Sequence, residues 1–188
     1  MKIVAINGGL HRGCRIDSLI GHLLAVAQQS KAATVHHALC VFKNLQHCQE
    51  CGACQRYNRH CVLKDDLAPV LNSLEEADVL VMGTPITGED PTAYFKIFFD
   101  RFYSFLKNDG SCSLPPGKKA VIVLSPGASE AEFLKTVETF EAWLQPFRFS
   151  ELHWVLYRRD GQDEAYGVID AVVKKLISGT EKPKGNHT

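Results

Sequence analysis

Short apolar runs alternate with amphipathic segments along most of the chain. Runs that are apolar throughout are typical of strands in parallel sheets, which are buried on both faces. Such runs predict strands over residues 2–7, 34–42, 78–85, 119–124 and 149–157. The segments between them repeat apolar residues at helical spacing, which predicts helices over residues 18–30, 67–77, 91–107, 130–144 and 164–177. The alternation predicts an α/β fold.

Five strands alternating with helices favour a flavodoxin-like parallel sheet of order 2-1-3-4-5, with helices on both faces. No linker divides the chain, so residues 1–180 are expected to form a single domain that carries a cysteine-rich loop at residues 47–62. The polar residues 181–188 are expected to be a disordered tail. Ligands of such sheets bind at the carboxyl ends of the strands, where the loops from Gly8, Thr84 and Ser125 would open.

Capping residues mark the expected helix starts. Asp17 or Ser18 can cap the first helix, and Asp65–Asp66 can cap the second. Asp90–Pro91 is expected to open the third, with proline at the first helical position. Ser129–Glu132 matches a capping box before the fourth helix.

The expected helix at 91–107 is apolar on an unusually wide arc. Its aromatic residues exceed the single stripe of about 100° that a helix on a sheet needs. The surplus predicts an interface between copies of the chain, for which a homodimer is the simplest closed form. The alternative is that a neighbouring helix covers the excess.

Composition narrows the class of partner. The chain has 188 residues, 45% of them hydrophobic and 22% charged, with a net charge of zero and a pI near 7.1. This balance gives no electrostatic footprint for nucleic acid or an anionic membrane. The N-terminal run lacks a small-residue cleavage site and no run of apolar residues is long enough to span a bilayer. A cytoplasmic location is therefore expected.

A cluster of thiols with the spacing C-x2-C-x2-C-x6-C is made by Cys48, Cys51, Cys54 and Cys61. Thiolates this close together repel one another and oxidise readily, so such a cluster usually binds a metal or does redox chemistry. Compact C-x2-C-x2-C runs are typical of iron–sulfur loops, whereas zinc more often takes separated C-x2-C pairs. Disulfides and reactive thiols are the alternatives. His47 and His60 could replace a ligand, and the isolated Cys14, Cys40 and Cys112 are expected to be inert.

A glycine-rich, basic connection follows the first expected strand. A turn from a strand into a helix presents free N–H groups and the positive end of the helix dipole, which favour a phosphate. His11, Arg12 and Arg15 add positive charge. The connection matches neither G-x-G-x-x-G nor a P-loop, and glycines also serve such turns for steric reasons alone.

Several separated stretches together resemble the NAD(P)H-dependent FMN reductase and iron–sulfur flavoprotein group of the flavodoxin-like superfamily. The resemblance covers most of residues 1–110. Its stretches are Cys48–Cys54 with Cys61–Asp66, Glu76–Asp78, Gly83–Ile86 and Lys96–Arg101.

The resemblance implies FMN at the carboxyl edge, with its phosphate on the first loop and its ring against the loop after Pro85. The implied cofactor-binding residues are Gly8, Gly9, His11, Arg12, Arg15, Asp17, Ser18, Thr84, Pro85, Ile86, Thr87, Gly88, Ser125 and Gly127. NAD(P)H is the implied reductant, and a small molecule or a protein the electron acceptor. The four clustered cysteines would ligate a 4Fe-4S cluster, and the group suggests a homodimer or tetramer. No catalytic acid or base is required, and Lys96, Asp100 and Arg101 are expected to be structural.

The chain departs from the group's pattern at two places. Gly9–His11 and Arg15–Ile16 stand where the group has Ser-x-Arg and Asn-Thr, and Thr87–Glu89 stands where it has a tyrosine and an aromatic-glycine pair. The phosphate loop therefore lacks hydroxyl and amide partners. Two alternative functions use the same scaffold: a flavin-free zinc-binding module and a metal-free thiol redox sensor.

Overall fold

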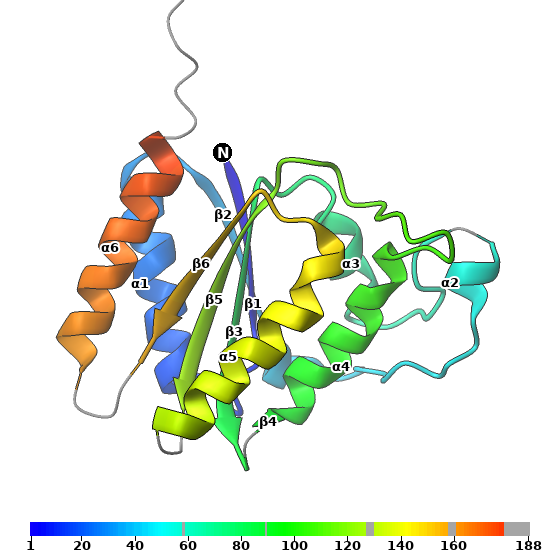
Figure 1. Ribbon diagram of the computed structural model, residues 1–188, viewed down its shortest axis with the longest axis horizontal. Coiled ribbons are helices and arrows are strands. Elements are labelled where there is room, and N and C mark those ends of the chain that lie inside the picture. Colours follow the sequence, from blue (N-terminus) through cyan, green and yellow to red (C-terminus); the bar gives the residue numbers. More distant parts are fainter. Residues whose placement is uncertain (58, 89, 127–129, 158–160, 179–188) are drawn as a thin grey trace, which may run out of the picture.

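The computed structural model describes residues 1–57, 59–88, 90–126, 130–157 and 161–178. These residues form a sheet with helices on both faces (Figure 1). The expected tail at 181–188 lies outside the described residues, as does the Ser129 capping position.

Five parallel strands build the sheet in the order β2-β1-β3-β5-β6. They are β1 (Lys2–Asn7), β2 (Ala33–Ala38), β3 (Val79–Thr87), β5 (Lys119–Pro126) and β6 (Glu151–Leu156). Counted as parallel strands along the chain, this is the predicted order 2-1-3-4-5. The expected second strand is shorter than predicted, because a 3₁₀ turn at Leu39–Val41 replaces its last residues.

A short sixth strand, β4 (Asp90–Pro91), pairs antiparallel with the end of β3. The prediction that Asp90 and Pro91 open the next helix is therefore wrong. Thr92 is the N-cap instead, and its hydroxyl accepts a hydrogen bond from the Phe95 N–H at 3.2 Å. The same hydroxyl donates to the Gly8 carbonyl. This residue ties the start of the helix to the loop after β1.

The helices are α1 (Arg15–Gln29), α2 (Ala53–Arg56), α3 (Ala68–Ser73), α4 (Ala93–Phe102), α5 (Glu130–Leu144) and α6 (Gln162–Ser178), with further 3₁₀ turns at Tyr103–Phe105 and Gln145–Phe147. The first helix begins at Arg15, with Cys14 as its N-cap, so neither Asp17 nor Ser18 caps it. None of the described helices combines the length and the apolar character that crossing a membrane requires.

Two apolar clusters, one on each face of the sheet, pack the helices into two layers. Alternate side chains of β1 point to opposite faces: Ile3 and Ala5 pack with α1 and α6, whereas Val4 and Ile6 pack with α3, α4 and α5. Figure 1 shows these helices on opposite sides of the sheet. The core therefore lies on both faces, as the uniformly apolar strands predict.

The wide apolar arc of α4 is covered within the chain. Phe95, Phe98, Phe99 and Phe102 are each at most 1% exposed. Aromatic rings from α5 and the following turn stack on them, with Phe147 centred 4.3 Å from Phe102. The structural reason for an interface on this helix is therefore wrong, and association into a homodimer or tetramer stays a prediction from the family resemblance.

Candidate cofactor site and cysteine loop

The loop between β1 and α1 passes very close to its neighbours. The Gly8 N–H donates to the Gly83 carbonyl at 2.7 Å, and a Cβ on Gly8 would lie 2.6 Å from the Phe95 Cβ. The Gly9 N–H donates to the Asn7 side chain at 2.8 Å. Both glycines are buried, so they shape the loop and allow this approach.

Asp17 anchors the loop from the first turn of α1. Its carboxylate accepts hydrogen bonds from the Gly13 N–H and the Asn7 amide, each at 2.8 Å. Arg12 lies 3.4 Å and His36 3.6 Å from the same carboxylate. Burial lowers the pKa of His36 against the opposing pull of Asp17, so the imidazole is largely neutral at pH 7 and Arg12 is the facing cation.

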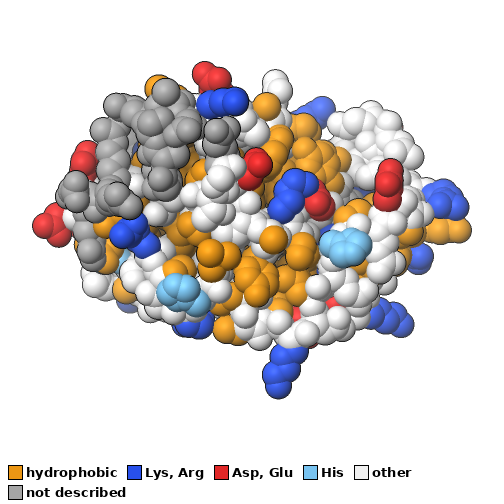
Figure 2. Space-filling view, turned by 90° about the horizontal axis from the view of Figure 1, so that it is seen from below, with side chains coloured by type: hydrophobic (Ala, Val, Ile, Leu, Met, Phe, Trp, Pro, Cys, Tyr) orange, Lys and Arg blue, Asp and Glu red, His pale blue; other side chains and the backbone are white. Residues whose placement is uncertain are grey.

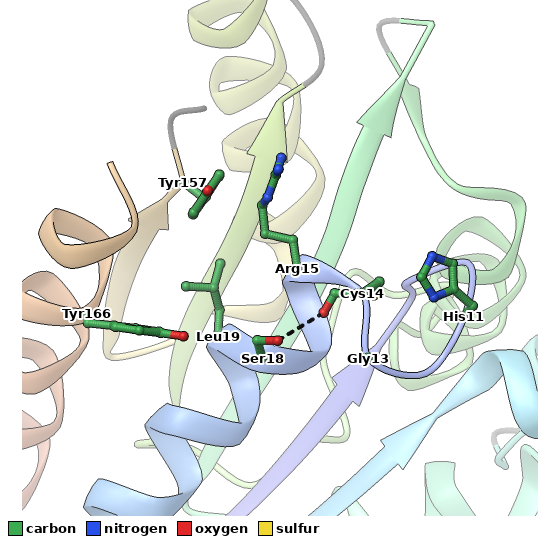
Figure 3. Close-up of a pocket in the computed structure, with 8 residues that line it drawn as sticks. All are labelled: His11, Gly13, Cys14, Arg15, Ser18, Leu19, Tyr157 and Tyr166. Atoms are coloured by element: carbon green, nitrogen blue, oxygen red, sulfur yellow. Dashed lines mark hydrogen bonds between the residues drawn. The ribbon is translucent and has the colours of Figure 1, made fainter. Parts of the chain in front are cut away.

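A cavity of about 420 Å³ opens beside the N-terminus of α1 (Figure 3). Its lining consists of His11, Gly13, Cys14, Arg15, Ser18, Leu19, Tyr157 and Tyr166. The Arg15 guanidinium and the Tyr157 ring point toward one another, 4.4 Å from guanidinium carbon to ring centroid. This cation–π contact holds Arg15 over the cavity.

The cavity has the chemistry of an anion site. The first N–H groups of a helix, here those of Arg15 to Asp17, have no intrahelical acceptors, and the helix dipole adds partial positive charge. His11 and Arg15 bring basic side chains to the same place. A phosphate group fits these donors.

The structure brings together some of the predicted phosphate-loop residues and separates others. His11, Arg15 and Ser18 line the cavity, whereas Arg12 faces Asp17. Cys14 also lines it, and the expectation that this thiol is inert stays a prediction. The sequence reasoning missed Tyr157 and Tyr166. Tyr157 directly follows β6, and the rule that strand ends meet at one edge could have indicated it.

The residues after β3 divide between core and surface. The Thr84 hydroxyl is buried and accepts from the Thr92 N–H at 3.2 Å, and Ile86 is 4% exposed within the core. Pro85 is half-buried, while Thr87 and Gly88 are exposed in the hairpin to β4. Figure 2 looks onto this carboxyl edge, where apolar side chains lie among basic, acidic and histidine side chains. Ser125 is buried at the end of β5, and Gly127 lies outside the described residues.

The cysteine loop runs from the end of β2 past α4 to the outer side of the molecule (Figure 1). Cys48 and Cys51 are exposed, and Cys54 and Cys61 are half-buried. Across the described part of the chain, no three His, Cys, Asp or Glu side chains converge to hold a metal ion. This arrangement does not fit a preformed single-ion site. In its chemistry the four-thiol donor set fits an iron–sulfur cluster, which Cys48, Cys51, Cys54 and Cys61 would ligate.

The histidines beside the cysteines are engaged elsewhere. The His60 imidazole lies 3.1 Å from the Glu75 carboxylate and packs on Phe105, with ring centroids 5.2 Å apart. The His47 ring contacts the Cys48 carbonyl at 2.9 Å. Neither contact directs an imidazole toward the thiols as a replacement ligand.

A buried ion pair between Arg101 and Asp65 closes the base of this loop, with both side chains 0% exposed. Asp65 also accepts from the N–H groups of Gln46, at 2.8 Å, and Ala68, at 3.1 Å. Burial opposes the charged form of Asp65, but these hydrogen bonds and that from Arg101 outweigh it and lower its pKa. The N-cap of α3 is Leu67, which makes no side-chain capping bond, so the prediction that Asp65 or Asp66 occupies the cap is wrong, although Asp65 does accept from the first N–H of the helix. The buried ion pair agrees with the structural role expected for Arg101.

A sequence profile of the family described as NADPH-dependent FMN reductase matches residues 1–150. The chain belongs to the NADPH-dependent FMN reductase family. Its flavodoxin-like fold and its class, oxidoreductase, agree with the resemblance noted in the sequence.

Two similar proteins and one solved structure show how far the likeness extends. An iron–sulfur flavoprotein of Methanosarcina thermophila is 28% identical over 145 residues, which are 77% of this chain and 73% of that protein. One of Archaeoglobus fulgidus is 31% identical over 103 residues, 54% of this chain and 48% of its own length. An FMN-dependent NADH-azoreductase from Bacillus anthracis, solved in complex with FMN, superposes with a TM-score of 0.73 at 10% identity, covering 94% of this chain and 100% of that one.

Proposed function

We propose that this member of the FMN reductase family is an FMN-dependent NAD(P)H oxidoreductase with the flavin phosphate in the cavity beside α1. The observation that carries the proposal is the placement of His11, Arg15 and Ser18 around one cavity beside the N-terminus of α1, at the carboxyl edge. Family membership over residues 1–150 supports a flavin as the anionic ligand.

The residues in and around this cavity have different roles in ligand binding. Arg15, steadied by Tyr157, supplies the principal charge for the phosphate. Asp17 does not contact the ligand; it fixes the Gly13 N–H and keeps Arg12 turned away from the cavity. The exposed Thr87 and Gly88 would hold the flavin ring. When bound, the flavin would supply the chemistry of accepting hydride from NAD(P)H and passing electrons to a small-molecule or protein acceptor.

Two measurements test this function. Titration of the purified protein with FMN, followed by quenching of flavin fluorescence, is expected to give one site per chain. Anaerobic oxidation of NADH and of NADPH should then require added FMN and an artificial acceptor. A protein that binds no FMN and oxidises neither nucleotide would support the flavin-free alternatives instead.

The finer part of the proposal is that the cysteine loop binds one 4Fe-4S cluster through Cys48, Cys51, Cys54 and Cys61. Support comes from the four-thiol donor set and from the relatives' description as iron–sulfur flavoproteins. Zinc is less favoured, since no three donors converge in the described residues.

Iron and sulfide analysis after anaerobic reconstitution tests the cluster. We expect about four irons per chain, strong loss of iron in Cys51→Ser, and none in the control Cys112→Ser, which changes a half-buried thiol outside the loop. Fewer than three irons per wild-type chain would refute the cluster.

A further inference from the structure

The Arg101 side chain carries hydrogen-bond donors that the rest of the described structure leaves unused. Its Nε and Nη2 groups are buried and have no hydrogen-bond partner among the described residues. Leaving a buried charged donor unpaired is costly, so each such group calls for an explanation. Its Nη1 group is satisfied, since it binds Asp65 and donates to the Gln46 carbonyl at 3.2 Å.

Cys61 is the thiol that lies beside this guanidinium. Its sulfur lies close enough to the Arg101 side chain to interact with it. The sulfur nevertheless completes no hydrogen bond with Nε or Nη2. Cys61 also packs on the aromatic core that includes Phe102 and Phe105. The unused donors therefore adjoin a held, half-buried sulfur.

Arg101 also bridges both ends of the cysteine loop. Gln46 directly precedes the loop and Cys61 closes it, and both contact the same guanidinium or its partner Asp65. Cys48 and Cys51, by contrast, are exposed. The Cys61 position is thus held on the core, while Cys48 and Cys51 lie on the exposed part of the loop.

We propose that Arg101 is a positioning residue that fixes Cys61 and donates its unused N–H groups to sulfur of the group that the cysteine loop binds. This inference rests on the iron–sulfur part of the proposed function. Charge-assisted hydrogen bonds to sulfur stabilise the more negative, reduced state of a cluster and so raise its reduction potential. Lysine would keep the charge but cannot present the planar fork that reaches Asp65, Gln46 and sulfur together.

The test compares wild type, Arg101→Lys and the double variant Asp65→Asn with Arg101→Met. The double variant removes both charges, so folding does not depend on an uncompensated carboxylate. The control is Lys96→Met, which breaks an exposed pair with Asp100 on the same helix. Each protein is reconstituted anaerobically with iron and sulfide, and iron content, reduction potential and FMN affinity are measured.

We expect the double variant to bind FMN within about twofold of wild type but to lose at least half of its iron, or to hold a cluster of more negative potential. Arg101→Lys should retain a potential closer to wild type, and Lys96→Met should match wild type in all three measurements. Full iron content with an unchanged potential in the double variant would overturn the proposal.

The remaining outcomes separate this inference from the flavin function. A wild-type protein that binds FMN but takes up no iron overturns both the cluster and the role of Arg101, and leaves the flavin function standing. A wild-type protein that takes up iron with an Arg101-dependent potential but binds no FMN supports this inference and overturns the flavin function.

Discussion

Replacement of Arg101 by methionine alone is expected to lower the free energy of unfolding by about 3–5 kcal/mol, because Asp65 then keeps a buried charge without its partner. Guanidinium chloride unfolding, followed by circular dichroism, measures the loss. Adding Asp65→Asn to this variant should restore part of the stability, because no charge stays buried and the single amide oxygen can still accept from one of the two N–H groups, those of Gln46 and Ala68, that the two carboxylate oxygens bind.

Lys96→Met provides the matched comparison for this effect. Lys96 and Asp100 are also paired on α4, but their side chains are 49% and 37% exposed. Exposed pairs contribute at most about 1 kcal/mol, so we expect a change no larger than that. If Lys96→Met and Arg101→Met lowered the free energy of unfolding equally, burial of the Arg101–Asp65 pair would not be what determines its contribution to stability.

Replacement of Arg15 by alanine is expected to raise the dissociation constant for FMN roughly tenfold to a hundredfold. Hydrogen bonds to charged groups contribute about 1.5–3 kcal/mol, and Arg15 is the guanidinium that Tyr157 holds over the cavity. Isothermal titration calorimetry with FMN measures the change.

Riboflavin and the variant Arg12→Ala serve as controls for this measurement. Riboflavin lacks the phosphate, so its affinity should be nearly the same in wild type and Arg15→Ala. Arg12 faces Asp17 and its side chain is 57% exposed, so Arg12→Ala should weaken FMN binding by less than about threefold, because an exposed pair is worth little. An unchanged FMN affinity in Arg15→Ala would place the phosphate elsewhere.

The parallel sheet was predictable because each of its strands can be identified from the residues of one short segment. Runs such as Ile3–Ile6 are apolar on both faces, and only a sheet covered by helices on both sides buries them fully. β4 was not predictable, since a strand of only two residues exists through its pairing with the end of β3. The packing over Phe99 could not be predicted from the sequence either, because it comes from Trp143 and Phe147, which lie far along the chain.

In the candidate site, too, features encoded in one short segment were predictable, and features that depend on contacts between distant segments were not. Arg15 and His11 could be predicted because charge and a helix start are properties of one short segment. The place of Tyr157 directly after β6 could have indicated it, but Tyr166 reaches the cavity from α6, and the sequence pattern carries no sign of that contact. The unused donors of Arg101 depend on burial and on the geometry of three separate segments, which only the folded chain defines.

The hydrogen bonds made by Thr92 affect the free energy with which a ligand would bind at the carboxyl edge of the sheet. The Gly8 backbone binds Gly83 on β3, the Thr92 hydroxyl binds Gly8, and the Thr92 N–H binds Thr84, so the first loop and the β3–β4 hairpin form one braced frame. A ligand that spans a preorganised frame loses little free energy to ordering the backbone. In the proposed phosphate site, such rigidity would compensate in part for the hydroxyl and amide side chains that the first loop lacks.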